Sequence, residues 1–330
     1  MMIKEDAARV SVHRTVLLHE VIDGLLAPKK AGNKNLVVVD ATFGGGGHSL
    51  EICKKYPSVK IIALDQDKSA LDRGKEKFSD CKISFHNVNF RDLDKVLDEE
   101  VDPVRSRPLD YESATVTLGR PASNGIDGII FDLGLSSDQL EVSGRGFSFL
   151  KDEPLLMTMK RNPDPEDVTA YDVVNTWGEE NLADIIYGYG EEKFAKRIAR
   201  GIVEARKKSE IKTTFDLVKI ISDAVPAIYR RGRLHFATRT FQAIRIAVND
   251  ELGALAMGLE KGFKFLKSGG RIAVISFHSL EDRVVKKFFK NKEEAGEGKR
   301  VNKKIIIPSE SEIKDNPRAR SAKLRIIEKT

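Results

Sequence analysis

The chain has 330 residues, of which 41% are hydrophobic, and a formal net charge of +6, so we expect one large domain or two ordinary ones with a sizeable core. No apolar run is long enough to span a membrane, and the first residues lack the apolar core of a signal peptide, which disfavours membrane and secreted proteins. Two cysteines, Cys53 and Cys81, predict neither a disulfide framework nor a zinc cluster, so we expect a cytoplasmic protein without a metal site.

The first third of the chain alternates helices with buried strands. An amphipathic helix is expected over residues 16–26, and strands are expected over 36–39 and 60–65. Four consecutive glycines, 44–47, follow the first strand, and a backbone without side chains can approach a ligand closely. Asp65 ends the second strand, where a Rossmann-like sheet binds ribose hydroxyls. The pattern predicts an adenosine-type cofactor.

The residues around the glycines indicate which cofactor this is. The dinucleotide fingerprint needs G-x-G-x-x-G, but Ser49 and Leu50 stand where its third glycine belongs. Asp40, shortly before the loop, would repel a pyrophosphate, whereas it suits the sulfonium and ammonium groups of S-adenosylmethionine. S-adenosylmethionine is therefore favoured over NAD. The alternative is a turn without a ligand, which is disfavoured because each glycine costs about 0.5–1 kcal/mol in a regular element.

Two further strands extend the predicted sheet. One covers residues 82–87, and Phe90 lies just past it, where an aromatic ring can pack on adenine. The other covers 128–132 and ends in Asp132, at the same edge of the sheet as the glycine loop. Residues 102–124 between them are expected to form a polar loop without helical periodicity. Helices are expected over 67–78 and 92–100.

The alternation of strands and helices stops at residue 141 and resumes after 236. Helices are expected inside this interruption over 166–176, 179–189, 191–208 and 213–224. After it we expect one or two helices over 239–267, a fifth strand over 270–277, and a terminal strand pair over 303–308 and 321–328. We therefore predict an α/β fold with a Rossmann-like, mostly parallel sheet and an antiparallel C-terminal edge, formed by 1–140 and 237–330. Residues 141–236 form an inserted all-helical domain for substrate recognition.

Basic residues gather in two regions of the chain. Residues 191–239 hold 13 Lys and Arg against six Asp and Glu, and residues 286–330 hold 14 against seven. The rest of the chain is net acidic, so the two regions indicate a polyanionic partner, most simply a nucleic acid. The alternative, solvated helix faces, is the common explanation for a single charged run.

Seven motifs together resemble one known family. They are 40–48 (DATFGGGGH), 132–139 (DLGLSSDQ), 144–149 (GRGFSF), 189–198 (YGEEKFAKRI), 238–245 (TRTFQAIR), 276–283 (SFHSLEDR) and 316–321 (NPRARS). They occur in order from near the N-terminus to the C-terminus, and several are long and unusual. The chain is similar to the RsmH (MraW) family, the bacterial 16S rRNA cytosine-N4 methyltransferases.

The resemblance implies a class I methyltransferase fold, S-adenosylmethionine as methyl donor, and a decoding-centre (P-site) cytosine of 16S rRNA in the small ribosomal subunit as acceptor. The chain departs from the family at Leu156 and Thr158, where the family commonly has Asp and Arg, as if a local ion pair had been replaced. Carried over by position, the family's cofactor contacts fall on Gly46, Gly47, His48, Asp65, Phe90, Asp132 and Gln139. Asp40, which the residues themselves indicate, completes the predicted cofactor site.

The chemistry of the implied acceptor narrows the catalytic candidates. The exocyclic amine of cytosine is conjugated with its ring and nucleophilic only weakly, so the site must accept its hydrogen bonds, align it and receive a proton late. Alignment alone supplies up to about 7–11 kcal/mol in favourable cases. We predict Asp132, Ser136, His278 and Glu281 as catalytic residues. The alternatives are a helix cap for His278 and a carboxylate favoured by the helix dipole for Glu281.

RNA contacts are predicted for five arginines: Arg145, Arg197, Arg239, Arg318 and Arg320. For Arg145 the alternative is a salt bridge. Two other functions stay open, namely methylation of another nucleic-acid amine and a non-catalytic role as an rRNA-binding assembly factor. A homodimer is a further possibility that the sequence leaves open.

Overall fold

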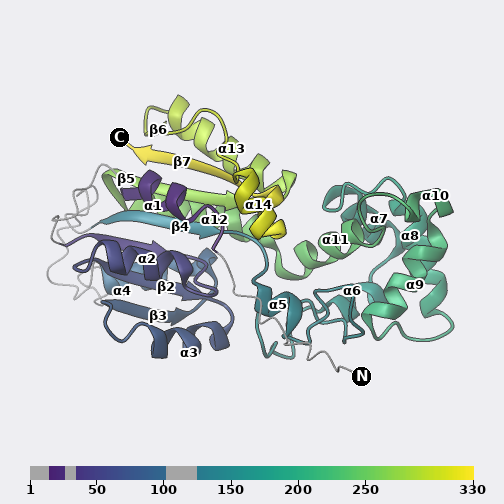
Figure 1. The fold of residues 1–330 in the computed structure, drawn as a ribbon. Helices are drawn as coiled ribbons and strands as arrows, with labels where there is room; N and C mark the ends of the chain where they lie inside the picture. The colour runs from purple at the N-terminus through teal and green to yellow at the C-terminus, as the bar shows by residue number, and fades with distance from the viewer. Residues whose placement is uncertain (1–14, 27–34, 102–124) are drawn as a thin grey trace, which may run out of the picture.

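A computed structural model describes residues 15–26, 35–101 and 125–330, so the polar loop predicted over 102–124 lies outside the described residues. Its centre is a seven-stranded sheet in the order β3-β2-β1-β4-β5-β7-β6 (Figure 1). The strands are β1 (Val37–Asp40), β2 (Lys60–Asp65), β3 (Ile83–Asn87), β4 (Ile126–Asp132), β5 (Leu266–Ser276), β6 (Gly298–Arg300) and β7 (Lys323–Lys329). The first five strands of the chain, β1 to β5, are parallel to one another, whereas β7 runs antiparallel to β5 and to β6. This topology confirms the predicted class I methyltransferase fold, with its Rossmann-like sheet and antiparallel C-terminal edge.

Helices cover both faces of this sheet. They are α1 (Leu18–Leu26), α2 (Gly47–Lys55), α3 (Lys68–Lys77), α4 (Leu93–Glu100), α12 (Glu251–Phe265) and α13 (Ser279–Glu294). Successive strand residues point to opposite faces, so Val39 and Ile129 pack with α4, α12 and α13, whereas Val38 and Ile130 pack with α1 and α2. Both faces are buried, as parallel strands require.

The chain leaves the sheet after β4 and builds a second, helical body beside it (Figure 1). Its helices are α5 (Ser137–Glu141), α6 (Ala170–Thr176), α7 (Glu179–Gly188), α8 (Ala195–Arg206), α9 (Thr214–Ala224), α10 (Ala227–Arg230) and α11 (Thr238–Asn249). They enclose a separate hydrophobic core that includes Leu182, Ile198, Leu217 and Ile244. The predicted insertion ends at 236, but Ile244 shows that the helical core continues into α11. The chain turns back to the sheet at Asp250, which adopts a left-handed backbone with φ 45°.

The C-terminal strand pair differs from the prediction. Residues 303–308 form no strand, and Ile306 makes only an isolated bridge to Leu324. The side chain of Asn302 takes part of the place of a strand, because it accepts the Ile326 N–H and shares the Leu324 carbonyl with the Ile306 N–H. The second strand of the edge is instead β6, and α14 (Glu310–Asp315) and the 3₁₀ helix η2 (Pro317–Ser321) precede β7.

The expectation about the cysteines is also corrected. Cys53 and Cys81 form a disulfide, with Cα atoms 5.9 Å apart. Cys53 lies on α2 and Cys81 in the turn before β3. The crossover between β1 and β2 brings these segments together, and a count of cysteines carries no information on such a contact. None of the described helices is long and apolar enough to cross a membrane.

Candidate active site

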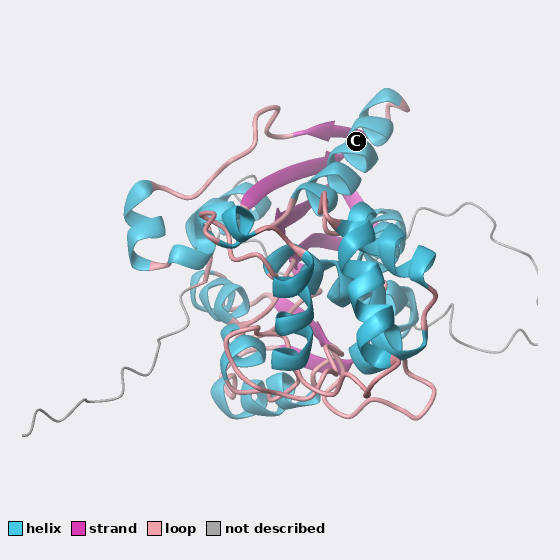
Figure 2. Cartoon of the chain, turned by 90° about the vertical axis from the view of Figure 1, so that its right-hand side faces the viewer, coloured by secondary structure: helices cyan, strands magenta, loops and turns pink. Residues whose placement is uncertain are grey.

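A cavity of about 450 Å³ opens beyond the carboxyl ends of β1, β2, β4 and β5, between the sheet and the helical body. Figure 2 views the molecule from the side of the helical body and shows the helices of that body in front of the strands. Of the predicted cofactor and catalytic residues, Gly47, His48, Asp65, Phe90, Asp132, Ser136, Gln139 and Glu281 line it. These residues come from the ends of β2, β3 and β4 and from the starts of α2, α5 and α13, so the topology alone brings them together.

The glycine loop forms one wall of the cavity and is tied to β2. Gly44 and Gly46 have φ values of 51° and 70°, which favour glycine. A Cβ atom on Gly46 would lie 2.6 Å from the ring of Phe43, so no larger residue fits there without rearrangement. The Gly44 N–H donates to Asp65 Oδ2 at 2.7 Å, and the Asp67 N–H donates to Oδ1 at 2.8 Å. Asp65 therefore fixes the loop, and its oxygens retain lone pairs for a ribose hydroxyl.

Two predicted cofactor contacts, Gly46 and Asp40, do not line the cavity. Gly46 is buried beneath the loop. Asp40 accepts the Ser49 hydroxyl at 2.6 Å and the Thr42 N–H at 3.3 Å, so it holds the start of α2 against β1. Burial raises the pKa of Asp40 to about 6, against the effect of the Ser49 hydrogen bond. Sequence spacing could not distinguish a residue in the wall from one immediately behind it.

Three carboxyl groups line the cavity: Asp65 and Asp132, which are half-buried, and Glu281, which is buried. Burial raises the pKa of Asp65 to about 6 and that of Asp132 to about 8, and the nearby charges of Asp40 and Glu281 raise that of Asp132 further. A cation placed here would stabilise the ionised forms and relieve their mutual repulsion. The cavity therefore fits a cofactor with a positive sulfonium, whereas a pyrophosphate would be repelled.

Phe90 and Gln139 also line the cavity. The Phe90 ring packs edge-on against Phe131 at 5.5 Å between centroids, which holds it at the end of β3. The Gln139 side chain accepts the Ser136 N–H at 2.9 Å, while the Ser136 hydroxyl accepts the Gln139 N–H at 3.2 Å. This reciprocal capping box begins α5. The Ser136 hydroxyl still has a proton to donate into the cavity.

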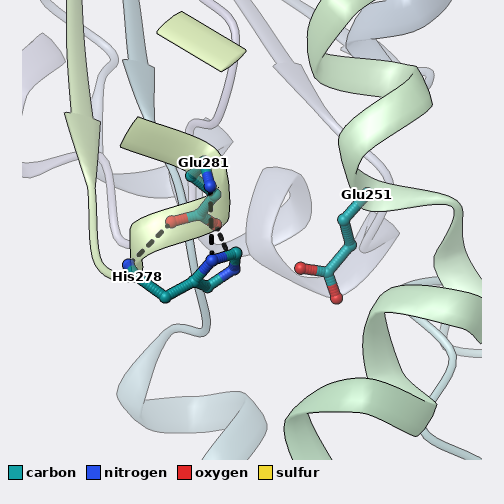
Figure 3. Close-up of side chains that lie close together, drawn as sticks. All are labelled: Glu251, His278 and Glu281. Carbon is teal, nitrogen blue, oxygen red and sulfur yellow. Dashed lines mark hydrogen bonds and ion pairs between the residues drawn. The ribbon is translucent and has the colours of Figure 1, made fainter. Parts of the chain in front are cut away.

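His278 begins α13 as its N-cap (Figure 3). Its Nδ1 accepts the Glu281 N–H at 3.3 Å, and its Nε2 lies 3.1 Å from Glu281 Oε1. Both ring nitrogens of His278 therefore contact Glu281. His278 itself is not among the residues that line the cavity. Burial alone would raise the pKa of Glu281, but the His278 contacts and the Phe277 N–H lower it below its usual value. Glu281 is thus a buried anion facing Asp132.

Glu251, His278 and Glu281 offer ligand atoms within 4.8 Å of one another, a spacing that a metal ion could bridge (Figure 3). Two observations favour a hydrogen-bonded network instead. Both oxygens of Glu251 already accept from Arg245, at 2.7 and 2.9 Å. Nδ1 of His278 accepts a backbone hydrogen, which leaves the ring proton on Nε2, beside Glu281.

The predicted RNA contacts occupy different environments. Arg145 is only 4% exposed and donates to Asp67 at 2.6 Å and to the carbonyl oxygens of Thr158 and Met159. The salt-bridge alternative therefore describes Arg145, and the predicted RNA contact is corrected, because its charge is neutralised inside the protein. Arg318 borders the cavity and donates to Ser137 at 2.6 Å.

The remaining predicted arginines, Arg197, Arg239 and Arg320, lie outside the cavity lining, and contact of Arg318 and these three with RNA stays a prediction. Arg197 and Arg320 are exposed, whereas Arg239 is partly buried.

Sequence reasoning missed Asn249, Glu251 and Thr42 in the cavity wall. Asn249 accepts the Met159 N–H at 2.8 Å and donates to the Met157 carbonyl at 2.7 Å, so it fixes the segment in which Leu156 and Thr158 depart from the family. Together with Arg145 it holds this segment through its backbone, which does not depend on the missing side chains. Asn249 and Glu251 flank the turn into α12, where no spacing marks them. Thr42 lies inside the glycine motif.

Comparisons with known proteins agree with these observations. The model of the MraW methylase family matches residues 10–330. "Ribosomal RNA small subunit methyltransferase H" of Limosilactobacillus fermentum is 43% identical, over 96% of this chain and 98% of its own. The protein of the same name from Acetivibrio thermocellus is 46% identical with the same coverage. These matches confirm the resemblance given by the motifs, and with it S-adenosylmethionine as the cofactor. The chain belongs to the MraW methylase family.

Proposed function

We propose that this protein transfers the methyl group of S-adenosylmethionine to the exocyclic N4 of a decoding-centre cytosine of 16S rRNA. The observation that carries the proposal is the pair Asp132 and Glu281, which lies in the same cavity as the glycine loop. The relatives named small-subunit rRNA methyltransferases support the class of substrate. The basic regions of the chain suit a substrate with a phosphate backbone.

We assign Asp132 as the residue that binds the exocyclic amine and accepts its proton. Bound S-adenosylmethionine supplies an activated methyl group and a positive charge. Asp132 in its ionised form accepts a hydrogen bond from the amine and then takes the proton that the methylated nitrogen must lose. A pKa of about 8 in the free protein places Asp132 close to the working pH, where a proton acceptor is most effective.

Glu281 and Ser136 support this role. Glu281 stays anionic and raises the pKa of Asp132 through its charge, and its own position is set by His278, which we therefore assign as a positioning residue. Ser136 can donate its hydroxyl proton to the ring nitrogen beside the amine, since its oxygen already accepts the Gln139 N–H. The acceptor base must leave its stack to enter the cavity, which costs a few kcal/mol.

The cysteines give no support to methylation at carbon 5. That reaction would need a thiolate that adds to the base. The two cysteines of the chain, Cys53 and Cys81, are joined to each other, and neither lines the cavity. Amine methylation needs no covalent intermediate, which agrees with the carboxyl and hydroxyl side chains of Asp132, Glu281 and Ser136 in the lining.

The affinity for the cofactor is expected to rise with pH. Below pH 8 the sulfonium must bind to a site whose Asp132 is protonated, so binding is coupled to loss of a proton and the affinity rises by up to about tenfold per pH unit. S-adenosylhomocysteine carries the same amino-acid group without the sulfonium charge, and its affinity should change less. Calorimetry with both ligands between pH 6 and 8 measures the difference. Equal pH dependences for the two ligands would contradict this electrostatic account.

Binding of rRNA is expected to depend steeply on salt. If four phosphates are contacted on a single strand, the affinity should fall by roughly 50-fold between about 50 and 200 mM salt, because counterions are released on binding. A fluorescence-anisotropy titration with a labelled rRNA fragment measures it. An affinity that does not change with salt would contradict an RNA substrate.

The choice of acceptor tests the proposed function against its alternatives. The protein is incubated with labelled S-adenosylmethionine and, separately, with small ribosomal subunits lacking the modification, naked 16S rRNA, single-stranded DNA and ribosomal proteins. We expect label in the rRNA only. Label in DNA or protein would overturn the proposal in favour of another acceptor. Cofactor binding without any transfer would favour the non-catalytic assembly factor.

A further inference from the structure

A second cavity, of about 370 Å³, lies on the helical body outside the active site. Four segments form it: the residues leading into α8, the helix α10, the turn from α10 to α11, and the first turn of α11. We call it the basic pocket, and its lining includes Lys193, Phe194, Ile228, Tyr229, Arg233 and Arg239. Of the described residues that line it, three are cations and none is an acid. Such a pocket favours an anionic ligand.

The aromatic wall of the basic pocket is held in place from behind. The rings of Phe194 and Tyr229 meet edge to face, with centroids 4.9 Å apart. The Tyr229 hydroxyl donates to Glu192, which is fully buried and also accepts the Phe194 N–H at 2.8 Å. The Lys193 ammonium lies 5.1 Å from the Phe194 centroid and 5.3 Å from that of Tyr229. Cations and half-buried aromatic rings are therefore presented together, as in proteins that bind single-stranded nucleic acids.

A short chain of contacts joins the basic pocket to the active site. Arg239 donates to the Glu191 carbonyl at 3.1 Å. The Glu191 carboxylate in turn accepts from Ser279 at 2.9 Å and from Arg283 at 3.2 Å. Ser279 begins α13, and Glu281 two residues later lines the active-site cavity. The basic pocket is thus linked through Arg239 and Glu191 to the first turn of α13, whose Glu281 lines the active-site cavity.

We propose that the basic pocket binds a nucleotide of the single-stranded RNA segment whose target base enters the active site. Its cations hold backbone phosphates on either side of that nucleotide, and the rings of Phe194 and Tyr229 pack on its base. Stacking on an aromatic ring tolerates any base, so the pocket contributes affinity and placement but no sequence preference. The proposal rests on the proposed function, since it takes RNA as the polymer that the active site modifies.

A charge-matched pair of double variants tests this assignment. The test pair is Lys193→Ala with Arg233→Ala. The control pair is Lys196→Ala with Arg231→Ala, which removes the same charge from exposed residues of the same two segments outside the pocket lining. Binding of a fluorescein-labelled oligouridylate is followed by anisotropy over a salt series. Calorimetry with S-adenosylmethionine shows whether each variant keeps its cofactor site.

We expect the test pair to lose about tenfold or more in affinity and the control pair about twofold or less. Each lost phosphate contact lowers the slope of log affinity against log salt by about 0.7 on a single strand, so the test pair should lower it by about 1.4. Phe194→Leu, which removes only a ring, should weaken binding without changing the slope. Test and control pairs with the same affinity and slope would overturn the proposal, as would polyglutamate competing as strongly as unlabelled RNA.

The outcome separates this proposal from the proposed function. If the native protein methylates rRNA while the two double variants bind the oligonucleotide equally, the basic pocket alone is refuted. If the native protein transfers no methyl group to rRNA while only the test pair loses RNA affinity, the pocket is supported and the reaction assigned above is refuted.

Discussion

Asp132→Asn is expected to lower the rate of methyl transfer by about 10²–10⁴-fold, the range that a positioned proton acceptor contributes. The amide keeps the shape of the side chain and can still accept a hydrogen bond from the amine, but it cannot take the proton. Single-turnover transfer to rRNA measures the effect. Asp138→Asn is the matched control, because Asp138 lies in the first turn of α5, is outside the cavity lining and pairs with Arg73 at 3.1 Å.

The same substitution is expected to stabilise the ligand-free protein. The pKa of Asp132 is raised on folding, so the folded state holds a proton that the unfolded chain releases. Its contribution to stability is fully present below the ordinary pKa of 3.8 and is lost as the pH rises through about 8. Asparagine does not titrate, so the melting temperature of Asp132→Asn should exceed that of the native protein by more at pH 8 than at pH 5. A variant that is both inactive and less stable at pH 8 would contradict the role given to Asp132.

Arg145→Ala is expected to destabilise the protein by about 3–5 kcal/mol, because it leaves the buried Asp67 carboxylate without its partner. The side chains of Arg145 and Asp67 are 4% and 6% exposed. Burial raises the pKa of Asp67, but hydrogen bonds from Ser69 and the charge of Arg145 lower it below its usual value. Arg145 also donates to two carbonyl oxygens beside the cavity wall, so the substitution loosens the junction between sheet and helical body. Urea unfolding measures the loss.

Arg73→Ala is the matched control for Arg145→Ala. Arg73 also pairs across the junction, from α3 to Asp138 on α5, but the two side chains are 52% and 43% exposed. Water screens such a pair, and its loss should cost about 1 kcal/mol or less. Equal effects of the two substitutions would show that the buried pair does not hold the junction together.

The strand ends were predictable because each combines a buried apolar run with an acid or glycine directly after it. Asp65 and Asp132 both followed from this pattern, and the structure places both in the cavity wall. What could not be predicted was which residue lies in front of another. Asp40 follows its strand in the same way as Asp65, yet it faces Ser49 and not the cavity.

Contacts between distant parts of the chain were the other source of error. Arg145 resembles an RNA-binding arginine in sequence, and its partner Asp67 is 78 residues away. The Cys53–Cys81 disulfide and the Asn302 contacts that take part of the place of a strand at 303–308 likewise depend on how segments are brought together. Local pattern predicts elements and their ends, whereas the partners of buried polar groups depend on tertiary structure.

The most direct test of the reaction is to locate the methyl group on its acceptor. Small ribosomal subunits lacking the modification are incubated with the protein and labelled S-adenosylmethionine, and the rRNA is digested and analysed by mass spectrometry. We expect N4-methylcytidine at one decoding-centre position, and Asp132→Asn should nearly abolish it. Label on carbon 5 of cytosine, on another base, or spread over many positions would contradict it.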